Sequence, residues 1–180
     1  MKLIDTCFDE VKIFSLEKYE DSRGFFLEKY HKKRYLEHNI GDDFIQDNHS
    51  RSFKNVLRGL HFTQDNPQSQ LMTVITGKVY DVVVDVRTNS KTFGMYAGFN
   101  LGGDNPQQIY MPHGFAHGFC VLSEVADLHY KVSKFYNGED EKGLLWNDKN
   151  IGIKWPINNP IISERDQKHP KLNEYFNTSF

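Results

Sequence analysis

LMTVITGKVYDVVVDVR, residues 71–87, is the longest run of β-branched residues in the chain. Valine, isoleucine and threonine favour the pleated, half-buried surface of a sheet. The glycine of Thr76-Gly77-Lys78 interrupts the run near its middle. We therefore expect two consecutive β-strands, separated by a turn, at the centre of the fold.

Shorter apolar segments flank this run on both sides, and each is bounded by Gly, Pro, Asn or Asp. They predict one edge strand within residues 1–20, and further strands at 25–28, 44–50, 93–101, 107–111, 118–122 and 126–132. Short helices are expected at 31–38 and from 163–166 onward. Many short strands at intervals of about 8–12 residues are typical of an all-β sandwich or barrel.

Length, charge and cysteine content restrict the class of protein. The 180 residues suffice for one domain, 1–180, with a core that needs no disulfide or metal ion. A net charge of −2 gives no basic field for nucleic acid. Cys7 and Cys120 lie in unrelated contexts, and we expect both to be reduced. The acidic N-terminal residues do not resemble a signal peptide, and no apolar stretch is long enough for a membrane, so we expect a soluble, cytoplasmic protein.

The first candidate functional residue lies just before the central run, in Arg58-Gly59-Leu60-His61-Phe62. A titratable histidine beside an arginine, at the mouth of a sheet, suits a small-molecule site. Taken alone, His61 fits a structural histidine better, so its neighbours decide between the two interpretations.

A metal site is the first possibility to weigh for this histidine. Residues 112–119, PHGFAHGF, have the Pro-x-Gly-x-x-His spacing of the second sequence motif of cupins. A metal-binding cupin also supplies a His-x-His pair and a glutamate from earlier strands. Here Phe62 and Thr63 follow His61, and no set of three protein ligands is found. We therefore predict neither a metal site nor a cofactor.

Acid–base chemistry remains, with His61 as a general base. Tyr130 is a candidate acid, because a phenol can protonate a strongly basic, carbanion-like intermediate. Asp166 is a candidate carboxylate for orienting the base. Each has a plainer explanation when taken alone: Tyr130 as a core aromatic of a strand, and Asp166 as an acidic residue at a helix start.

A polar row is expected on one face of the strand at 44–50. Alternation places Gln46, Asn48 and Ser50 on the same side. Amide donors and acceptors can bind the edge of a base or a sugar. An ordinary solvent-facing strand explains the row equally well.

Taken together, these segments resemble the dTDP-4-dehydrorhamnose 3,5-epimerase family over about residues 14–166. The matching stretches are DSRGFF (21–26), QDNHS (46–50), VLRGLHF (56–62), residues 77–85, residues 112–119, LWND (145–148) with IGI (151–153), and SERD (163–166). The resemblance implies a cupin-type jelly roll, with an N-terminal strand extension and a C-terminal helical tail. It also implies a homodimer that uses no metal or other cofactor and acts on a nucleotide-diphospho-4-keto-6-deoxy sugar.

The resemblance also implies roles for individual residues. His61 matches the base, Asp166 the carboxylate that orients it, and Tyr130 the acid that delivers a proton from the opposite face. The matching substrate contacts are Arg23 and Arg58 for the diphosphate, Phe26, Glu28, Gln46 and Asn48 for the nucleoside, and His117 and Glu141 elsewhere in the pocket.

Two positions depart from the family pattern. Gln70 stands where the family usually has a lysine that is thought to stabilise the C4 enolate, and the loop from His61 is about one residue shorter. A neutral donor in place of a charged one costs on the order of 3 kcal/mol of transition-state stabilisation. His113 stands where the family often has glutamate, and we have no interpretation of it.

The sequence therefore predicts an epimerase that inverts C5 and also C3 of a nucleotide-linked 4-keto sugar of the dTDP-4-keto-6-deoxyglucose type. Two alternatives remain at this point. One is single epimerisation at C5 or C3, or a sugar carried on CDP or GDP. The other is a non-catalytic protein that binds sugar nucleotides, with Gln70 as the mark of lost activity.

Overall fold

The β-branched run at residues 71–87 folds as two strands that lie in different sheets. In the computed structural model, which describes residues 1–178, β7 (Gln70–Thr76) belongs to a six-stranded sheet and β8 (Lys78–Asp85) to a five-stranded sheet. Gly77 turns the chain between them with φ 82°, and a Cβ there would lie 2.1 Å from the carbonyl oxygen of Val125. This close approach and the positive φ explain why glycine occupies the turn.

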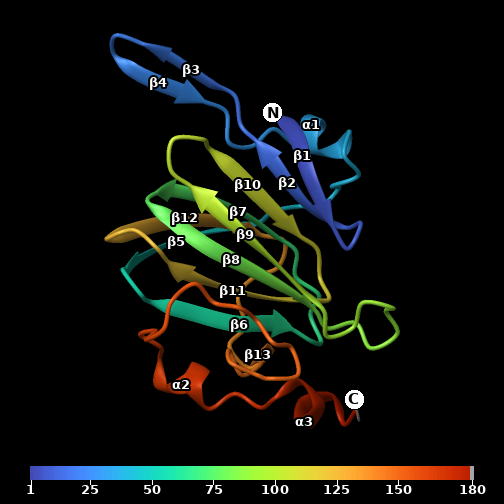
Figure 1. Cartoon of the computed structure of the whole chain (residues 1–180). Coiled ribbons are helices and arrows are strands. Elements are labelled where there is room, and N and C mark those ends of the chain that lie inside the picture. Colours follow the sequence, from blue (N-terminus) through green and yellow to red (C-terminus); the bar gives the residue numbers. More distant parts are fainter. Residues whose placement is uncertain (179–180) are drawn as a thin grey trace.

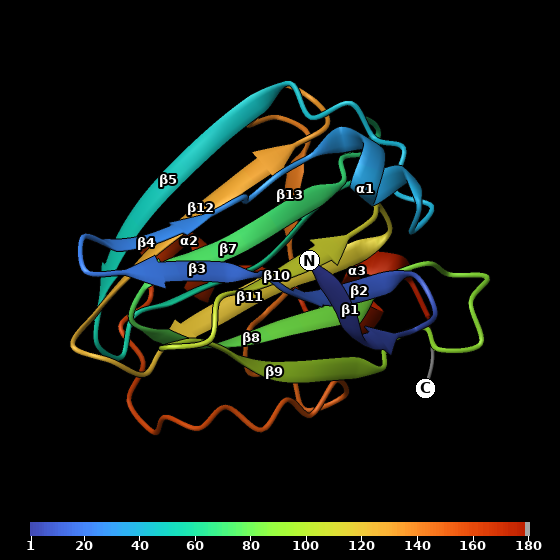
Figure 2. The ribbon, with the colours of Figure 1, turned by 90° about the horizontal axis from the view of Figure 1, so that it is seen from above.

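Strands that follow one another along the chain mostly alternate between the two sheets. The other strands are β1 (Lys2–Cys7), β2 (Val11–Ser15), β3 (Lys18–Asp21), β4 (Gly24–Leu27), β5 (Gln46–Phe53), β6 (Leu57–Thr63), β9 (Tyr96–Gly102), β10 (Gln107–Met111), β11 (Phe115–Val121), β12 (Val125–Val132) and β13 (Glu141–Gly143). The six-stranded sheet has the order β1-β2-β10-β7-β12-β5, and the five-stranded sheet has the order β13-β6-β11-β8-β9. Figure 2 shows the first sheet from above, with its strands side by side from β5 to β1. The chain is a jelly-roll sandwich, and the prediction of a cupin-type all-β fold is confirmed.

Buried apolar side chains fill the space between the two sheets and cover the outer face of the smaller one. The inner cluster includes Ile13, Met72, Val74, Val79, Val83, Ile109 and Leu128. Val82 and Val84 point the other way and pack against the C-terminal segment, which contributes Leu144, Ile151, Ile153, Trp155, Leu172, Tyr175 and Phe176. Because β8 is buried on both faces, it is a nearly continuous apolar run rather than an alternating one.

Three short helices lie outside the sandwich: α1 (Lys32–Leu36), α2 (Glu164–Gln167) and α3 (Leu172–Phe176). The α1 region covers one end of the six-stranded sheet, where Tyr35 and Ile40 pack on Leu71 and Tyr110. No helix within residues 1–178 is long and apolar enough to cross a membrane.

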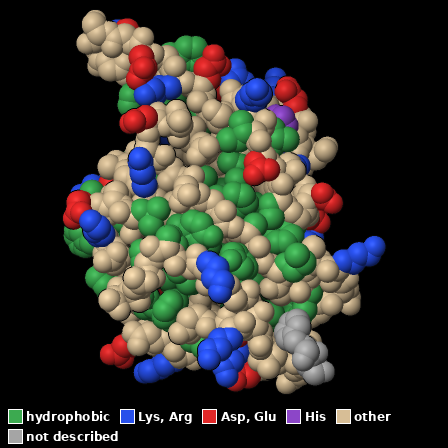
Figure 3. All heavy atoms as spheres, viewed as in Figure 1, with side chains coloured by type: hydrophobic (Ala, Val, Ile, Leu, Met, Phe, Trp, Pro, Cys, Tyr) green, Lys and Arg blue, Asp and Glu red, His purple; other side chains and the backbone are tan. Residues whose placement is uncertain are grey.

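The hairpin of β3 and β4 pairs with neither sheet of the sandwich. It projects from the opposite end of the molecule to α2 and α3 (Figure 1). In the same view, hydrophobic side chains gather across the middle of the sandwich, and charged side chains lie mostly near its margins (Figure 3). Phe25 and Phe26 of the hairpin are both largely exposed.

The prediction of one edge strand within the first twenty residues was wrong. This region forms β1, β2 and most of β3. The turn between β1 and β2 uses Phe8 and Asp9, with φ 53° and 63°. This left-handed backbone is uncommon for a phenylalanine, so the sequence gives little sign of the turn. The strand expected at 93–101 begins at Tyr96, since residues 88–94 form turns.

Candidate active site

A pocket of about 670 Å³ opens between the two sheets and the C-terminal segment. Its size suits a drug-sized or nucleotide-sized ligand. It is lined by residues of both sheets and of the segment after β12, among them Asn48, Ser50, Arg58, His61, Gln68, Gln70, His117, Tyr130, Tyr136, Glu141, Arg165 and Asp166.

His61 and Asp166 form a hydrogen-bonded pair in the wall of this pocket. His61 lies on β6, and its Nε2 is 2.9 Å from Oδ1 of Asp166, which is 3 % exposed. The Ser163 side chain caps α2 by accepting a hydrogen bond from the Asp166 N–H at 3.1 Å. The sequence SERD therefore fixes the place of the carboxylate through a local helix start.

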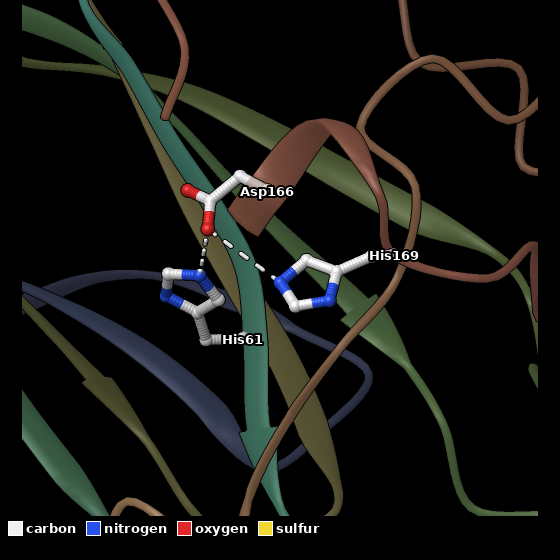
Figure 4. Close-up of side chains that lie close together, drawn as sticks. All are labelled: His61, Asp166 and His169. Carbon is white, nitrogen blue, oxygen red and sulfur yellow. Dashed lines mark hydrogen bonds and ion pairs between the residues drawn. The ribbon is translucent and has the colours of Figure 1, made fainter. Parts of the chain in front are cut away.

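Asp166 is held in its ionised form. Burial would raise the pKa of this carboxyl group, but hydrogen bonds from His61 and from the Gly59 N–H outweigh burial and hold the pKa well below its usual range. An ionised carboxylate only accepts hydrogen bonds. His61 therefore carries its proton on Nε2 and has its lone pair on Nδ1, which points away from Asp166 (Figure 4). A lone pair on Nδ1 is what a general base needs.

Gly59 brings β6 close to β11 at this pair. Its φ is 113°, and a Cβ there would lie 2.6 Å from Cα of Gly118 and 2.6 Å from the carbonyl oxygen of His117. Only glycine fits this approach. The same geometry directs the Gly59 N–H at Oδ2 of Asp166, at 3.2 Å.

A second histidine–carboxylate pair lies beside the first. His117 on β11 is the register partner of His61, and its Nε2 is 2.7 Å from Oδ2 of Asp81. Asp81 is fully buried, and its Oδ1 has no hydrogen-bond partner among residues 1–178. The sequence reasoning missed Asp81, although an acidic residue inside an apolar strand signals a buried partner.

Tyr130 lines the pocket from the other sheet. It lies on β12, between Asn48 of β5 and Met72 of β7. Burial raises the pKa of its hydroxyl group, the nearby Glu141 carboxylate adds to the increase, and Arg58 opposes it. The hydroxyl group therefore stays protonated at neutral pH and can donate a proton.

Arg165 is a further pocket residue that the sequence reasoning missed. Its guanidinium group lies 3.1 Å from His61 Nε2 and donates to Glu141 at 2.6 Å. Because the Nε2 proton already points to Asp166, the first contact is a close approach of two donors rather than a hydrogen bond. The only sign of Arg165 in the sequence is its place next to Asp166.

Two of the three residues of the polar row on β5 line the pocket, and the third, Gln46, is bonded to one of them. The two are Asn48 and Ser50, and Gln46 donates to the Asn48 side chain at 2.8 Å. The Gln46 side chain also accepts from the N–H of Tyr136 at 3.0 Å, which ties the strand to the loop after β12. Gln70 lines the pocket from β7 and donates to Gln68 at 3.4 Å.

Comparison with known proteins adds to this geometry. The sequence model of the dTDP-4-dehydrorhamnose 3,5-epimerase family matches residues 5–174. The chain belongs to this family. A dTDP-4-dehydrorhamnose 3,5-epimerase of Shigella flexneri is 46 % identical over 169 residues, which is 92 % of this chain and 93 % of the relative.

Two further relatives show the range of the epimerase family. The crystal structure of a dTDP-6-deoxy-D-glucose-3,5-epimerase from Legionella pneumophila, in complex with dTDP-4-keto-L-rhamnose, has a TM-score of 0.92 at 44 % identity and covers 96 % of this chain and 93 % of its own. A dTDP-4-dehydrorhamnose 3-epimerase of Streptomyces niveus is 39 % identical over 154 residues, 84 % of this chain and 74 % of its own. The family therefore includes both double and single epimerases.

Three residues that the epimerase resemblance assigned to the substrate lie away from this pocket. Arg23 and Phe26 are on the exposed hairpin, with Phe26 68 % exposed, and Arg23 pairs with Asp21 at 2.6 Å. Glu28 follows the hairpin and pairs with Arg34 at 2.8 Å. Within one chain, the fold does not bring these side chains to His61.

Proposed function

We propose that this protein is a cofactor-independent epimerase that inverts C5 and C3 of a dTDP-linked 4-keto-6-deoxy sugar. The observation that carries the proposal is the hydrogen-bonded pair of His61 and Asp166, which leaves Nδ1 of His61 free and lines a nucleotide-sized pocket. Membership of the family supports the reaction type.

The chemistry follows from the C4 ketone of such a sugar, which acidifies the hydrogens at C3 and C5. Nδ1 of His61 takes one of these protons, the C–H bond breaks, and its electron pair moves onto the C4 oxygen as an enolate. The ionised Asp166 stabilises the imidazolium that forms. Tyr130 then gives its proton to the carbon, and the ketone is restored.

Inversion requires the second proton to arrive on the opposite face of the sugar. His61 lies on the five-stranded sheet and Tyr130 on the six-stranded sheet, so the two groups enter the pocket from opposing walls. This placement of base and acid supports proton removal from one face and delivery to the other.

The remaining pocket residues suit a sugar nucleotide. Arg58 offers a guanidinium for the diphosphate, with a geometry that matches phosphate oxygens. The amides of Gln46 and Asn48 suit the nucleoside, and His117, Glu141 and Gln70 surround the sugar.

The chain acts as a homodimer in this proposal. Arg23, Phe26 and Glu28 lie outside the pocket of their own chain, on or next to a hairpin that projects from the sandwich. A second copy that presents this hairpin to the pocket would supply a guanidinium, an aromatic ring for stacking on the base, and a carboxylate. The hairpin's two exposed phenylalanines favour contact with another protein surface.

Solvent exchange tests the reaction. In D2O, the wild type is expected to introduce deuterium at C3 and C5 of dTDP-4-keto-6-deoxyglucose, read by mass spectrometry. His61→Ala is expected to lose nearly all exchange, Asp166→Asn to slow it, and activity to survive dialysis against EDTA. His129→Ala, a half-buried histidine outside the pocket, is the matched control. If a folded His61→Ala protein incorporates deuterium at the wild-type rate, His61 is not the base.

Mixed dimers test the shared pocket. His61→Ala and Phe26→Ala are each expected to be nearly inactive alone. If the hairpin serves the partner's pocket, a mixed dimer has one pocket with both the intact base and the intact hairpin, and activity returns on mixing. If native mass spectrometry verifies mixed dimers but activity does not return, each pocket is made by residues of one chain alone.

A single epimerase is the second candidate. Gln70 gives the pocket a neutral donor, and the 39 % identical relative from Streptomyces niveus is a 3-epimerase. The number of deuterium atoms introduced separates the two. A thermal-shift panel of dTDP, CDP and GDP identifies the carrier, because a bound ligand raises the unfolding midpoint.

A further inference from the structure

His169 lies beside the catalytic pair but has no role in the mechanism above. Its Nε2 is 3.5 Å from Oδ1 of Asp166, the same oxygen that His61 Nε2 contacts at 2.9 Å (Figure 4). This Nε2 atom is buried and makes no hydrogen bond within residues 1–178. This ring nitrogen is therefore available to a ligand placed between the three side chains.

The ring of His169 is held in this position by close packing. A Cβ on Gly143 of β13 would lie 2.3 Å from His169 Nε2, so only glycine leaves room for the ring. The rings of His61 and His169 are 5.7 Å apart and nearly perpendicular, at 83°. Two imidazole nitrogens thus approach one carboxylate oxygen from different directions.

We propose that His61, Asp166 and His169 form a binding site for a divalent transition metal ion, preferably Zn²⁺, and that metal binding switches the enzyme off. Their ligand atoms all lie within 4.8 Å of one another. Zinc binds nitrogen and carboxylate oxygen at about 2.0–2.2 Å, so ligands around it stand about 3.3 Å apart, and small side-chain rotations suffice. Two imidazoles and one carboxylate suit Zn²⁺, Ni²⁺ or Cu²⁺ better than Mg²⁺ or Ca²⁺.

Inhibition follows from the tautomer of His61. A neutral imidazole has one lone pair, and the metal takes it at Nε2. The proton that Nε2 donated to Asp166 then belongs on Nδ1, where the base must accept the substrate's proton. The metal therefore takes the place of the proton between His61 and Asp166. His61 keeps its position but can no longer accept a proton at Nδ1.

The metal would compete with Arg165 for this space. The guanidinium group lies 3.1 Å from His61 Nε2 and 3.4 Å from Asp166 Oδ1, and it carries the same sign of charge as the metal. Its side chain is 53 % exposed and already bonded to Glu141, so it can move outward. Removing this charge should strengthen metal binding.

His169 does not line the substrate pocket, whereas His61 and Asp166 do. The metal would thus bind at Nε2, on the opposite edge of the His61 ring from Nδ1, which the proposed reaction uses. Only the expected effect of zinc on the rate rests on the proposed function. If that function holds, zinc should lower kcat with little change in KM. Metal binding itself needs no substrate.

Calorimetric titration with ZnCl₂ tests the site. We expect one high-affinity ion per chain. His169→Ala should weaken binding at least about tenfold, since even groups that only orient a ligand cost about 10- to 100-fold. Arg165→Met should tighten binding. His129→Ala, which removes a similar half-buried histidine 3.5 Å from Asp47, is the control and should bind zinc like the wild type.

Anomalous diffraction from wild-type crystals soaked in ZnCl₂ is a second test that needs no variant. A zinc peak between the three side chains supports the proposal, and zinc confined to other histidines overturns it. Wild-type zinc affinity in a folded His169→Ala protein also overturns it. In exchange assays, zinc should stop deuterium incorporation by the wild type, EDTA should restore it, and the His169→Ala enzyme should stay active at that zinc concentration. If zinc occupies the site but the wild type shows no epimerisation without zinc, the proposed function fails and the metal site stands.

Discussion

Replacing Gln70 by lysine tests how the C4 enolate is stabilised. Gln70 is half-buried at the start of β7, lines the pocket, and donates only to Gln68, over a long 3.4 Å. Its amide is therefore free to turn toward a substrate oxygen, but it brings no charge. A hydrogen bond from a charged donor is stronger than a neutral one by about 1 kcal/mol, and a donor to a developing oxyanion is worth up to about 3 kcal/mol. Gln70→Lys should therefore speed enolate formation by roughly 5- to 150-fold.

The assay follows deuterium incorporation into dTDP-4-keto-6-deoxyglucose by mass spectrometry in D2O. Inverting both carbons needs the enolate twice, so we expect the wild type to introduce one deuterium well before the second. Gln70→Lys should shorten this delay or speed both steps. Gln68→Lys adds the same charge to the same wall two residues away and is the control. If the wild type introduces two deuterium atoms at similar, fast rates and Gln70→Lys changes neither, residue 70 does not contact the enolate.

Three further predictions concern the acid, a buried carboxylate and the turn between sheets. Tyr130→Phe removes the proposed proton donor and should allow exchange at the carbon facing His61 while abolishing inversion, as NMR of the product would show; continued inversion would assign the acid elsewhere. Burial would raise the pKa of Asp85, but hydrogen bonds from Arg87, Ser90 and Thr92 lower it from an ordinary 3.8 to about 2. This lowering corresponds to about 2 kcal/mol of stability at pH 7. A depressed pKa stabilises the fold above about pH 4, so the deficit of Asp85→Asn in urea unfolding should shrink as the pH falls toward 2; a constant deficit would contradict this. Gly77→Ala places a Cβ 2.1 Å from a backbone oxygen at φ 82° and should cost more than about 1 kcal/mol in urea unfolding, whereas Gly41→Ala, whose Cβ meets only a side chain at 3.7 Å, is the control.

The arrangement of strands was predictable where composition and pattern agree. β7, β8, β10 and β12 appear at the expected places because β-branched and aromatic residues there are bounded by clear turn residues. Alternation predicted that Asn48 and Ser50 share one face of a strand, but not that this face lines the pocket. β13 was not predicted, and α3 only as part of a C-terminal helical tail, because their burial depends on contacts with β6 and the outer face of β8 rather than on local pattern.

The site was predictable only in part, because it too depends on contacts between residues that are distant in the sequence. His61 and Asp166 are far apart in sequence; Asp166 was a candidate for orienting the base, but it had a plainer explanation as a helix-start residue until the resemblance to a family favoured their pairing. Asp81 left a signal, since a carboxylate inside an apolar strand must have a partner. His169 was missed although it stands only three residues after Asp166, and the room for its ring depends on Gly143, which lies on a strand well before it in the chain. The roles of Arg23, Phe26 and Glu28 stay predictions, because a single chain keeps them out of its own pocket.

The jelly roll accounts for the way the proposed acid and base face each other. Because successive strands alternate between sheets, β6 and β7 place His61 and Gln70 on opposing walls although they are close in sequence. The five-stranded sheet carries His61 and His117, with Asp166 packed beside it from α2, and the six-stranded sheet carries Tyr130. Epimerisation needs a base on one side of a flat enolate and an acid on the other. In the proposed reaction, a sandwich that binds its substrate between the sheets supplies the two sides from separate walls. On one wall the ionised Asp166 orients His61, and on the other burial raises the pKa of Tyr130.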